Sequence, residues 1–271
     1  MSSVSLHPDK IVAEHLGLTY VDEGTPGQAR RNVVLQDFNL SVREGEFLSV
    51  LGPSGCGKSS LLNILAGLVR QTQGDVRIDG QILSGVSRKL GVVFQGYALF
   101  PWRTVIENVE IGLEIRDVKR AERREQAAHF LSLVGLQAYG NHYPHQLSGG
   151  MRQRAAIARA LAYGPEVLLM DEPFGALDAQ TRESLQSELL AIWEKSAKTV
   201  VFITHSIDEA IFLSDRVAIM TRGPGKVKAI MEIPLPRPRD DSVRNSAQFL
   251  ALRQRAWELL KTEVAETAQP A

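Results

Sequence analysis

The sequence predicts an α/β fold built around a parallel sheet. Residues 167–170 and 200–203 are short apolar runs typical of buried strands. A helical segment lies between them, and one face of it carries Leu185, Leu189, Ile192 and Trp193. A third apolar run, residues 47–51, enters a glycine-rich loop that is followed by a helical pattern from Lys58 onward. Strands that alternate with helices predict a parallel sheet.

The remaining segments divide the chain into regions. The N-terminal third is rich in strand-forming patterns, whereas residues 97–146 become helical, with residues 121–134 rich in Glu, Arg, Gln and Ala and ended by Gly135. We therefore expect a helical lobe over about residues 97–155, inserted in a main domain over residues 1–240.

A short C-terminal region should follow, over residues 241–271. Pro234, Pro236 and Pro238 predict an extended linker leading to it. The linker is followed by a last helix with an apolar stripe of Phe249, Leu252, Ala256 and Leu260. From Glu263 onward we expect a disordered, flexible tail.

Composition excludes several classes of protein. Lys plus Arg and Asp plus Glu both number 31, so no net basic charge is available to bind nucleic acid. No apolar run approaches the roughly 20 residues that span a bilayer, and residues 1–10 do not resemble a signal peptide. The single cysteine, Cys56, cannot form an internal disulfide. We expect a cytoplasmic globular protein without nucleic acid as a partner.

The first chemical motif is a phosphate-binding loop, in which a glycine and four residues precede Gly-Lys-Ser. Its backbone N–H groups and the following helix start would surround phosphate oxygens, Lys58 would add a positive charge, and Ser59 would ligate Mg²⁺. A glycine turn without a ligand is the alternative, but the flanking strand and helix favour the loop. The predicted nucleotide-binding residues are Gly52, Pro53, Ser54, Gly55, Cys56, Gly57, Lys58, Ser59 and Ser60.

Two adjacent acids follow the strand predicted at residues 167–170. Ligands bind at the carboxyl edge of an open parallel sheet, which is where Asp171 and Glu172 would lie. Asp171 would coordinate Mg²⁺, and Glu172 would orient and deprotonate an attacking water. A solvated acidic turn is the alternative, which the phosphate-binding loop in the same chain disfavours.

A third motif, Leu-Ser-Gly-Gly-Met at residues 147–151, precedes a helical segment at residues 155–161. The Ser148 side chain and the N–H groups of Gly149 and Gly150 at a helix start form an anion site. An ordinary glycine-containing helix start is the alternative. The motif lies between the phosphate-binding loop and the Asp-Glu pair, and in sequence and position it resembles the signature motif of ABC transporter ATPases. In that family the signature motif contacts the nucleotide held by the opposite subunit.

The resemblance extends over about residues 11–260 and implies further roles. Tyr20 matches the aromatic residue that stacks on adenine, and Gln95 matches the glutamine that reaches Mg²⁺ and the attacking water. Asp178 matches a loop that crosses the dimer interface, although capping of the next helix is an equally good interpretation. His205 matches the histidine that hydrogen-bonds the γ-phosphate. The implied catalytic set consists of Glu172, Gln95 and His205.

The same resemblance implies the fold and the branch of the family. The implied fold is a P-loop ABC nucleotide-binding domain, with a RecA-like parallel-sheet core, an antiparallel β lobe and an inserted helical lobe. Residues 99–103, 143–154 and 172–178 look like those of nitrate, sulfonate and taurine importer ATPases. In this family the segment after Gln95 faces the membrane subunit, and its aromatic residues, including Trp102, would line a groove for that partner; local core packing is the alternative.

The implied activity is ATP hydrolysis that energises uptake of a small anion. A homodimer, or a pair of ABC subunits, would enclose two ATP molecules with Mg²⁺ at the cytoplasmic face of the inner membrane. An integral membrane permease would be the direct partner and a solute-binding protein an indirect one. An exporter subunit and a soluble ABC ATPase are the alternatives. Ser60, Met151 and Ser206 depart from the commoner residues of the family, and none of them removes a group needed for hydrolysis.

Overall fold

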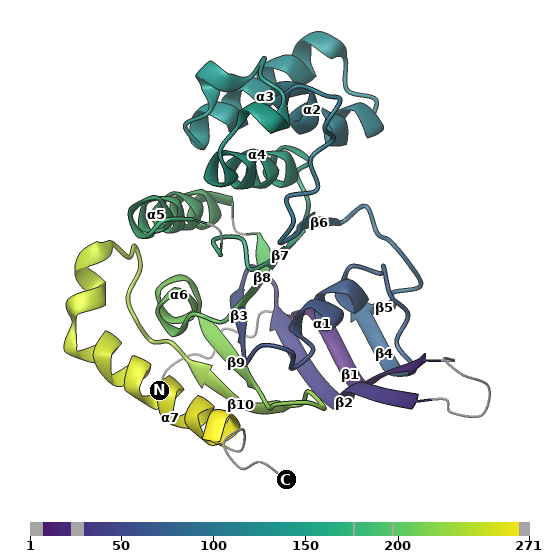
Figure 1. Cartoon of the computed structure of the whole chain (residues 1–271), viewed down its shortest axis with the longest axis vertical. Coiled ribbons are helices and arrows are strands. Elements are labelled where there is room, and N and C mark those ends of the chain that lie inside the picture. Colours follow the sequence, from purple (N-terminus) through teal and green to yellow (C-terminus); the bar gives the residue numbers. More distant parts are fainter. Residues whose placement is uncertain (1–7, 23–29, 176, 197, 266–271) are drawn as a thin grey trace. The chain divides into compact units, whose positions relative to one another are not determined.

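The computed structural model describes residues 8–22, 30–175, 177–196 and 198–265. The chain divides into two compact units, one formed by Met1–Ser87 with Ala197–Ala271 and the other by Arg88–Ser196. Figure 1 labels the helices and strands of both units.

The first unit contains an antiparallel sheet with the strand order β2-β1-β4-β5. Its strands are β1 (Asp9–Asp22), β2 (Arg30–Arg43), β4 (Gln73–Ile78) and β5 (Gln81–Ile82). Apolar side chains alternate along β1, so that Ile11 and Ala13 are buried while Glu14 is exposed. This alternation is the pattern of a sheet with one buried face, and it gives the antiparallel β lobe that the sequence predicted.

The same unit contains parallel strands that form its core. The strand β3 (Phe47–Leu51) pairs in parallel with β8 (Thr199–Thr204) and with β9 (Arg216–Met220), and β10 (Val227–Glu232) pairs antiparallel with β9. Every residue of β3, β8 and β9 is buried, which explains their nearly continuous apolar sequences. The helices of this unit are α1 (Lys58–Leu65), α6 (Ile207–Leu213) and α7 (Ala247–Ala265), with a short 3-10 helix, η3 (Asp241–Asn245), before α7.

The second unit combines a strand pair with six helical segments in its described residues. The strands β6 (Leu90–Val93) and β7 (Val167–Asp171) pair in parallel. The helical segments are α2 (Val105–Ile115), α3 (Arg120–Leu133), η1 (Gln137–Tyr139), η2 (Pro144–Gln146), α4 (Gly149–Ala162) and α5 (Ala179–Ser196). Helices α2, α3 and α4 lie together in this unit (Figure 1). They share a core cluster of small and branched side chains that includes Val109, Leu131 and Ala155.

Local signals explain where these helices begin and end. Thr104 caps α2 through a capping box, because its hydroxyl accepts from the N–H of Glu107 while the Glu107 carboxylate accepts from the N–H of Thr104. Helix α3 ends before Gly135, whose φ of 67° is left-handed, as the sequence predicted.

The structure corrects the prediction for the C-terminal tail. Helix α7 continues through Glu263 to Ala265, where disorder was expected. The Glu263 carboxylate accepts a hydrogen bond from Lys228 Nζ at 2.6 Å and another from the N–H of Arg222 at 3.0 Å. These long-range contacts hold the last turn of α7 on β10, and tail composition alone could not reveal them. Residues 266–271 lie outside the described part of the chain.

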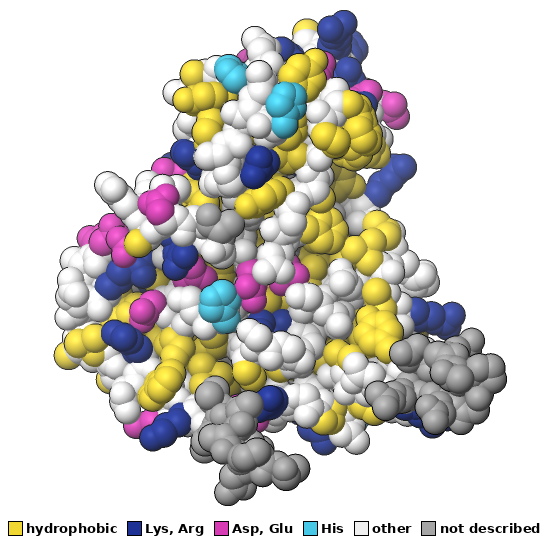
Figure 2. All heavy atoms as spheres, viewed as in Figure 1, with side chains coloured by type: hydrophobic (Ala, Val, Ile, Leu, Met, Phe, Trp, Pro, Cys, Tyr) yellow, Lys and Arg dark blue, Asp and Glu magenta, His cyan; other side chains and the backbone are white. Residues whose placement is uncertain are grey.

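Charged side chains are distributed without a dominant sign. On the face drawn in Figure 2, basic and acidic side chains are interspersed, and neither forms a continuous field. This distribution agrees with the net charge of zero. Among the helices of the described residues, none is both long enough and apolar enough to cross a bilayer.

Candidate functional site: a nucleotide-binding ATPase centre

The phosphate-binding loop joins the end of β3 to the start of α1 in the first unit. Gly55 and Gly57 adopt left-handed φ values of 78° and 99°, which L side chains rarely tolerate. The Lys58 ammonium is buried and donates to the carbonyl oxygens of Gly52 and Pro53, each at 2.9 Å. The free N–H groups in the first turn of α1 lie at the end of this loop, and N–H groups at a helix start favour the binding of an anion.

The hydroxyl groups of the loop are accessible. Ser54 and Ser59 are exposed and Ser60 is half-buried. Oxygen donors of this kind suit Mg²⁺, which is commonly held by one or two protein groups together with substrate phosphates. In the described residues, no cluster of three or more His, Cys, Asp or Glu side chains could hold a permanent metal ion.

The loop rests on segments that are distant in sequence. A methyl group placed on Gly57 would lie 3.0 Å from side-chain atoms of both Leu35 and Val34 in β2. A methyl group on Gly225 would lie 2.3 Å from the Cys56 carbonyl oxygen, so only glycine permits this approach. Gly225 also donates from its N–H to the Val34 carbonyl at 2.8 Å. The sequence analysis missed Gly225, although the Gly-Pro-Gly turn at residues 223–225 was a signal for a close backbone contact.

His205 lies beside the phosphate-binding loop at the carboxyl edge of the parallel strands. In the register of β3 and β8, Leu51 is opposite Thr204, so Gly52 and His205 leave neighbouring strands at the same level. The His205 side chain is exposed at this edge. Parallel strands bring the residues that follow them together at one sheet edge in this way.

Ser206 replaces a frequent aspartate of the family, and the structure gives its role. The Ser206 hydroxyl caps α6 by accepting from the N–H of Glu209 at 3.3 Å. Serine and aspartate are equally good N-cap residues. The departure therefore preserves the local structure beside His205.

Tyr20 lies near the end of β1 in the same unit. Its side chain is 46% exposed. It pairs across the strands with Asn32 of β2. An exposed aromatic ring at this position is accessible to a nucleobase, for which stacking is worth about 1–3 kcal/mol.

In the second unit, the two acids and Gln95 follow neighbouring parallel strands. Val93 of β6 is opposite Met170 of β7, so Gln95 and Asp171 emerge at one sheet edge. Asp171 is buried at the end of β7, and Glu172 is half-buried with a left-handed φ of 45°. A non-glycine residue in this region of φ is strained by about 1–3 kcal/mol, and such residues concentrate at functional sites.

Gln95 belongs to a tight turn of unusual backbone conformation. The N–H of Tyr97 donates to the Phe94 carbonyl at 3.2 Å, and both Tyr97 and Ala98 have left-handed φ values, of 62° and 48°. The Gln95 side chain is exposed. A turn fixed in this way presents Gln95 at the sheet edge while it changes the direction of the chain toward α2.

The Leu-Ser-Gly-Gly motif begins α4, as predicted. Ser148 is the N-cap, and its hydroxyl accepts from the N–H of Met151 at 3.3 Å. A methyl group on Gly149 would lie 3.3 Å from the Tyr97 hydroxyl, and one on Gly150 would lie 2.9 Å from Leu177. The motif therefore contacts both the turn after Gln95 and the segment before Asp178.

Asp178 begins α5, because its carboxylate accepts from the N–H of Thr181 at 3.0 Å. Backbone donors at this helix start lower the pKa of Asp178 below its ordinary value. The helix-capping interpretation of Asp178 is therefore confirmed. Ala176, in the same motif, lies outside the described residues.

A hollow of 900 Å³ lies on the helices of the second unit, downstream of Gln95. Trp102 borders it with a side chain that is 71% exposed and packs edge-to-face on Phe100 at 5.5 Å between ring centroids. The other lining residues are largely charged, and all but Arg103, which precedes α2, come from α2 and α3. They are Arg103, Glu107, Glu110, Glu114, Arg120, Ala121, Arg123 and Arg124.

Comparisons with known proteins agree with these features. Residues 35–175 match the family model described as ABC transporter. An uncharacterised ABC transporter ATP-binding protein of Methanocaldococcus jannaschii is 55% identical over 85% of this chain and 85% of its own length. The nitrate import ATP-binding protein of Synechococcus elongatus is 48% identical over 84% of this chain and 85% of its own.

Two further similarities come from an importer subunit and a solved structure. An aliphatic sulfonates import ATP-binding protein of Bacillus cereus is 46% identical over 82% of this chain and 86% of its own. A dimeric ATP-binding cassette bound to ADP and Pi in a post-hydrolysis state is 36% identical, with a TM-score of 0.75 over 83% of this chain and all of the other.

The chain thus carries a phosphate-binding loop, an acid pair after a buried strand and a Ser-Gly-Gly helix start. It also matches the ABC transporter model over residues 35–175 and is similar to ATP-binding proteins over 84–85% of its length. The chain belongs to the ABC transporter family, and it is an ATP-binding subunit that hydrolyses ATP.

Proposed function

We propose that this subunit energises import of a small anion through a separate integral membrane permease. The observation that carries the import role is the identity of 46–48% to ATP-binding proteins named for nitrate and aliphatic sulfonate import, over more than four fifths of each chain. A solute-binding protein would deliver the solute to the permease, which would carry it across the membrane. This chain would act at the cytoplasmic face of the membrane and would not contact the solute.

The catalytic residues are proposed from the resemblance to ABC ATPases, and each of them follows a strand at the sheet edge of its own unit. Glu172 would orient and deprotonate the attacking water, with Gln95 and His205 hydrogen-bonding the water and the γ-phosphate. Residues 52–60 would hold the ATP phosphates, and Tyr20 would stack on the base. Ser59, Gln95 and Asp171 supply hydroxyl, amide and carboxylate oxygens, which are the donors Mg²⁺ prefers. Bound there, Mg²⁺ would neutralise charge on the β- and γ-phosphates.

We also propose a head-to-tail dimer in which two ATP molecules are shared. The γ-phosphate bound by one subunit's loop would be contacted by Ser148, Gly149 and Gly150 of the other subunit. Asp178 would lie in a loop at the same dimer interface. The exposed Ser148 and its helix start support this role, because they offer N–H groups to an anion. The two subunits could be copies of this chain or a pair of related subunits. Hydrolysis would remove the shared contact and open the dimer.

The hollow that Trp102 borders is the proposed contact with the permease. An exposed aromatic anchor beside a charged rim is the composition of a helix-binding groove. Gln95 and the segment that follows it would transmit the opening and closing of the dimer to the permease. Trp102 supports this assignment because its ring remains largely accessible.

The test begins with the tagged Glu172→Gln variant, isolated with ATP from native membranes in mild detergent. Mass spectrometry should identify one polytopic permease of the importer type. The purified complex, placed in proteoliposomes with its binding protein, should take up one of nitrate, bicarbonate, taurine or methanesulfonate only when ATP is inside. Recovery of an exporter-type protein, or of soluble partners alone, would contradict the import role.

A further inference from the structure

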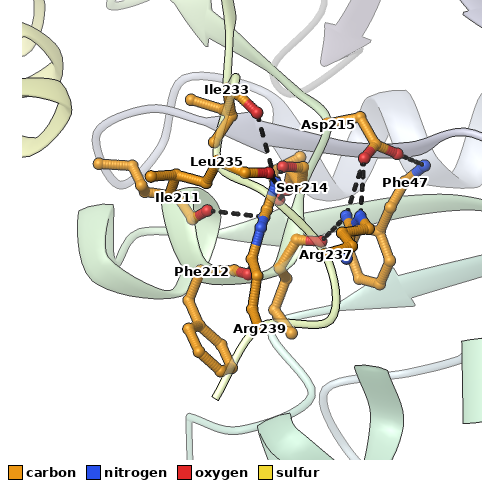
Figure 3. A network of polar contacts seen from close by, with 11 residues as sticks. Phe47, Ile211, Phe212, Ser214, Asp215, Ile233, Leu235, Arg237 and Arg239 are labelled. Carbon is orange, nitrogen blue, oxygen red and sulfur yellow. Dashed lines mark hydrogen bonds and ion pairs between the residues drawn. The ribbon is translucent and has the colours of Figure 1, made fainter. Parts of the chain in front are cut away.

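Two arginines of the C-terminal segment hold the carbonyl end of α6 (Figure 3). Arg239 donates from Nη1 to three of its carbonyl oxygens at 2.8 to 3.1 Å, and Arg237 donates from Nη2 to a fourth at 2.8 Å. The four successive acceptors are Ile211, Phe212, Leu213 and Ser214. The last carbonyl groups of a helix have no partner within it, so these bonds satisfy the end of α6.

Arg239 also fastens α6 to a segment that is distant in sequence. Its Nη2 donates to the carbonyl oxygens of Ile233 and Leu235, at 3.3 and 3.2 Å. The side chain is only 6% exposed. One planar guanidinium thus makes hydrogen bonds to five carbonyl groups, which the point charge of a lysine could not reproduce.

The other end of α6 is joined directly to His205. The Thr204 hydroxyl donates to the Glu209 carboxylate at 2.5 Å, and the N–H of Ser206 donates to the Thr204 hydroxyl at 3.0 Å. His205 therefore lies between two residues whose hydroxyl groups are both hydrogen-bonded to Glu209 in the first turn of α6. A shift of α6 would therefore also move the residues on either side of His205.

The helices η3 and α7 of the C-terminal segment add two further contacts to α6. Arg253 of α7 forms an ion pair with Asp208 at 3.3 Å, and the Arg244 guanidinium carbon lies 3.7 Å from the centroid of the Phe212 ring. Because α6 has only seven residues, tertiary contacts rather than its own hydrogen bonds fix its position. The C-terminal segment supplies part of these contacts, in addition to the packing of the buried side chains of Ala210, Ile211 and Phe212.

We propose that Arg239 is a positioning residue for ATP hydrolysis, which acts by fixing α6 and, through α6, the place of His205. This inference rests on the role proposed above for His205. Misplacement of a group in a reacting site by about 1 Å can cost about 100-fold in rate. Loss of the guanidinium contacts should therefore slow turnover while ATP binding, which depends on the phosphate-binding loop, is preserved.

The first test compares Arg239→Lys with Arg216→Lys in the full chain. Arg216 is equally buried, at 5% exposed, but it donates to the Glu46 carboxylate at 3.1 Å and to the Ser41 carbonyl at 3.4 Å. Both variants should lower Tm. Only Arg239→Lys should lower kcat, by about tenfold, with KM for ATP within about twofold of wild type. Equal kcat values for the two variants, or a loss confined to KM, would overturn the proposal.

The second test asks whether the effect passes through His205. In a His205→Ala background, single-turnover hydrolysis should fall by less than about twofold on adding Arg239→Lys, because residues that act as one unit are not additive. A full further tenfold loss would overturn the positioning role.

A milder variant covers the case in which Arg239→Lys does not fold. Arg237→Lys keeps a charge beside Asp215, to which Arg237 Nε donates at 3.0 Å, but gives up the fork that also reaches Leu213. It should lose about two- to fivefold in kcat, and the loss should likewise vanish in the His205→Ala background. A wild-type kcat would contradict the proposal.

These outcomes distinguish a failure of the proposed role of His205 from a failure of the proposed role of Arg239. Wild-type turnover by His205→Ala alone would remove the proposed catalytic role of His205 and the Arg239 inference with it. The Arg239 inference would be overturned, and the proposed function left intact, if His205→Ala were inactive while Arg239→Lys and Arg237→Lys kept wild-type turnover.

Discussion

Arg159 of α4 donates a hydrogen bond to the backbone carbonyl oxygen of Tyr97 at 2.9 Å. A second bond from the same guanidinium reaches the Ala98 carbonyl, and the Arg152 guanidinium carbon lies 5.5 Å from the centroid of the Tyr97 ring. The helix that begins with the Ser-Gly-Gly motif is thus bonded to the turn that presents Gln95. These contacts lie within one unit, so the turn and the helix should move together.

Replacing Arg159 with Met should destabilise this connection. Burial lowers the pKa of Arg159, yet arginine stays charged at neutral pH, so the variant removes a charged donor from two carbonyl groups. We expect a loss of about 1–3 kcal/mol in the free energy of unfolding, measured by urea denaturation. Arg116→Met is the control, because Arg116 is exposed on the same unit and packs on Tyr163 at 4.2 Å. Equal stability of the two variants would contradict this account.

Replacing Glu172 with Gln should separate ATP binding from hydrolysis. The amide keeps the shape of the side chain but cannot take a proton from water, so turnover should fall by about 10²–10⁴. An equilibrium binding assay measures the affinity for ATP, and the rate of phosphate release measures turnover. Glu166→Gln, at an exposed residue paired with Lys89 at 3.8 Å, should leave both unchanged. Near-normal turnover of the Glu172 variant would exclude it as the base.

Alkylation of Cys56 should report on occupancy of the phosphate-binding loop. The thiol is 1% exposed, and burial raises its pKa above the ordinary value. Because the thiolate is the reactive form, modification by N-ethylmaleimide should be slow at pH 7 and should accelerate as the pH rises toward this raised pKa.

Complete alkylation should abolish ATP binding, and ATP present beforehand should protect the thiol. Mass spectrometry measures the modified fraction, and a Cys56→Ser variant shows whether any loss arises elsewhere. Full ATPase activity in fully alkylated protein would show that the Cys56 side chain does not border the nucleotide.

Replacing Trp102 with Ala should weaken the permease contact without affecting basal hydrolysis. The ring is 71% exposed, so its removal creates no internal cavity. We expect at least a tenfold weaker association with the co-purified permease, since aromatic anchors at interfaces commonly contribute about 2 kcal/mol or more. Ile82→Ala, at a 60% exposed residue of β5, is the matched control. Unchanged association would remove Trp102 from the interface.

Much of the fold could be predicted because its signals are local. The apolar run of β3, the glycines of the loop and the helix after Lys58 lie within 19 residues, from Phe47 to Leu65. The pairing of β3 with β8, which places His205 beside the loop, comes from the structure. The strand β6 was not predicted, and its pairing with β7 places Gln95 and Asp171 at one edge.

The features that could not be predicted depend on contacts between distant residues. Arg239 stands in a proline-rich linker whose composition indicates only an extended chain, and its five acceptors are created by the fold. Glu263 is ordered by Lys228, which lies 35 positions earlier. The left-handed turn at Tyr97 and Ala98 has no glycine to indicate it. The roles of Tyr20, Gln95, Ser148 and His205 toward the nucleotide stay predictions.

The left-handed backbone of Glu172, at φ 45°, has an evolutionary consequence. Glycine or asparagine would occupy this conformation with less strain, so a sequence selected for stability alone would abandon glutamate there. With Glu172 as the proposed base, the carboxylate would persist only while hydrolysis is under selection. In a lineage that no longer needs the transporter, position 172 should be among the first to drift, and the resulting protein should be more thermostable as it becomes inert.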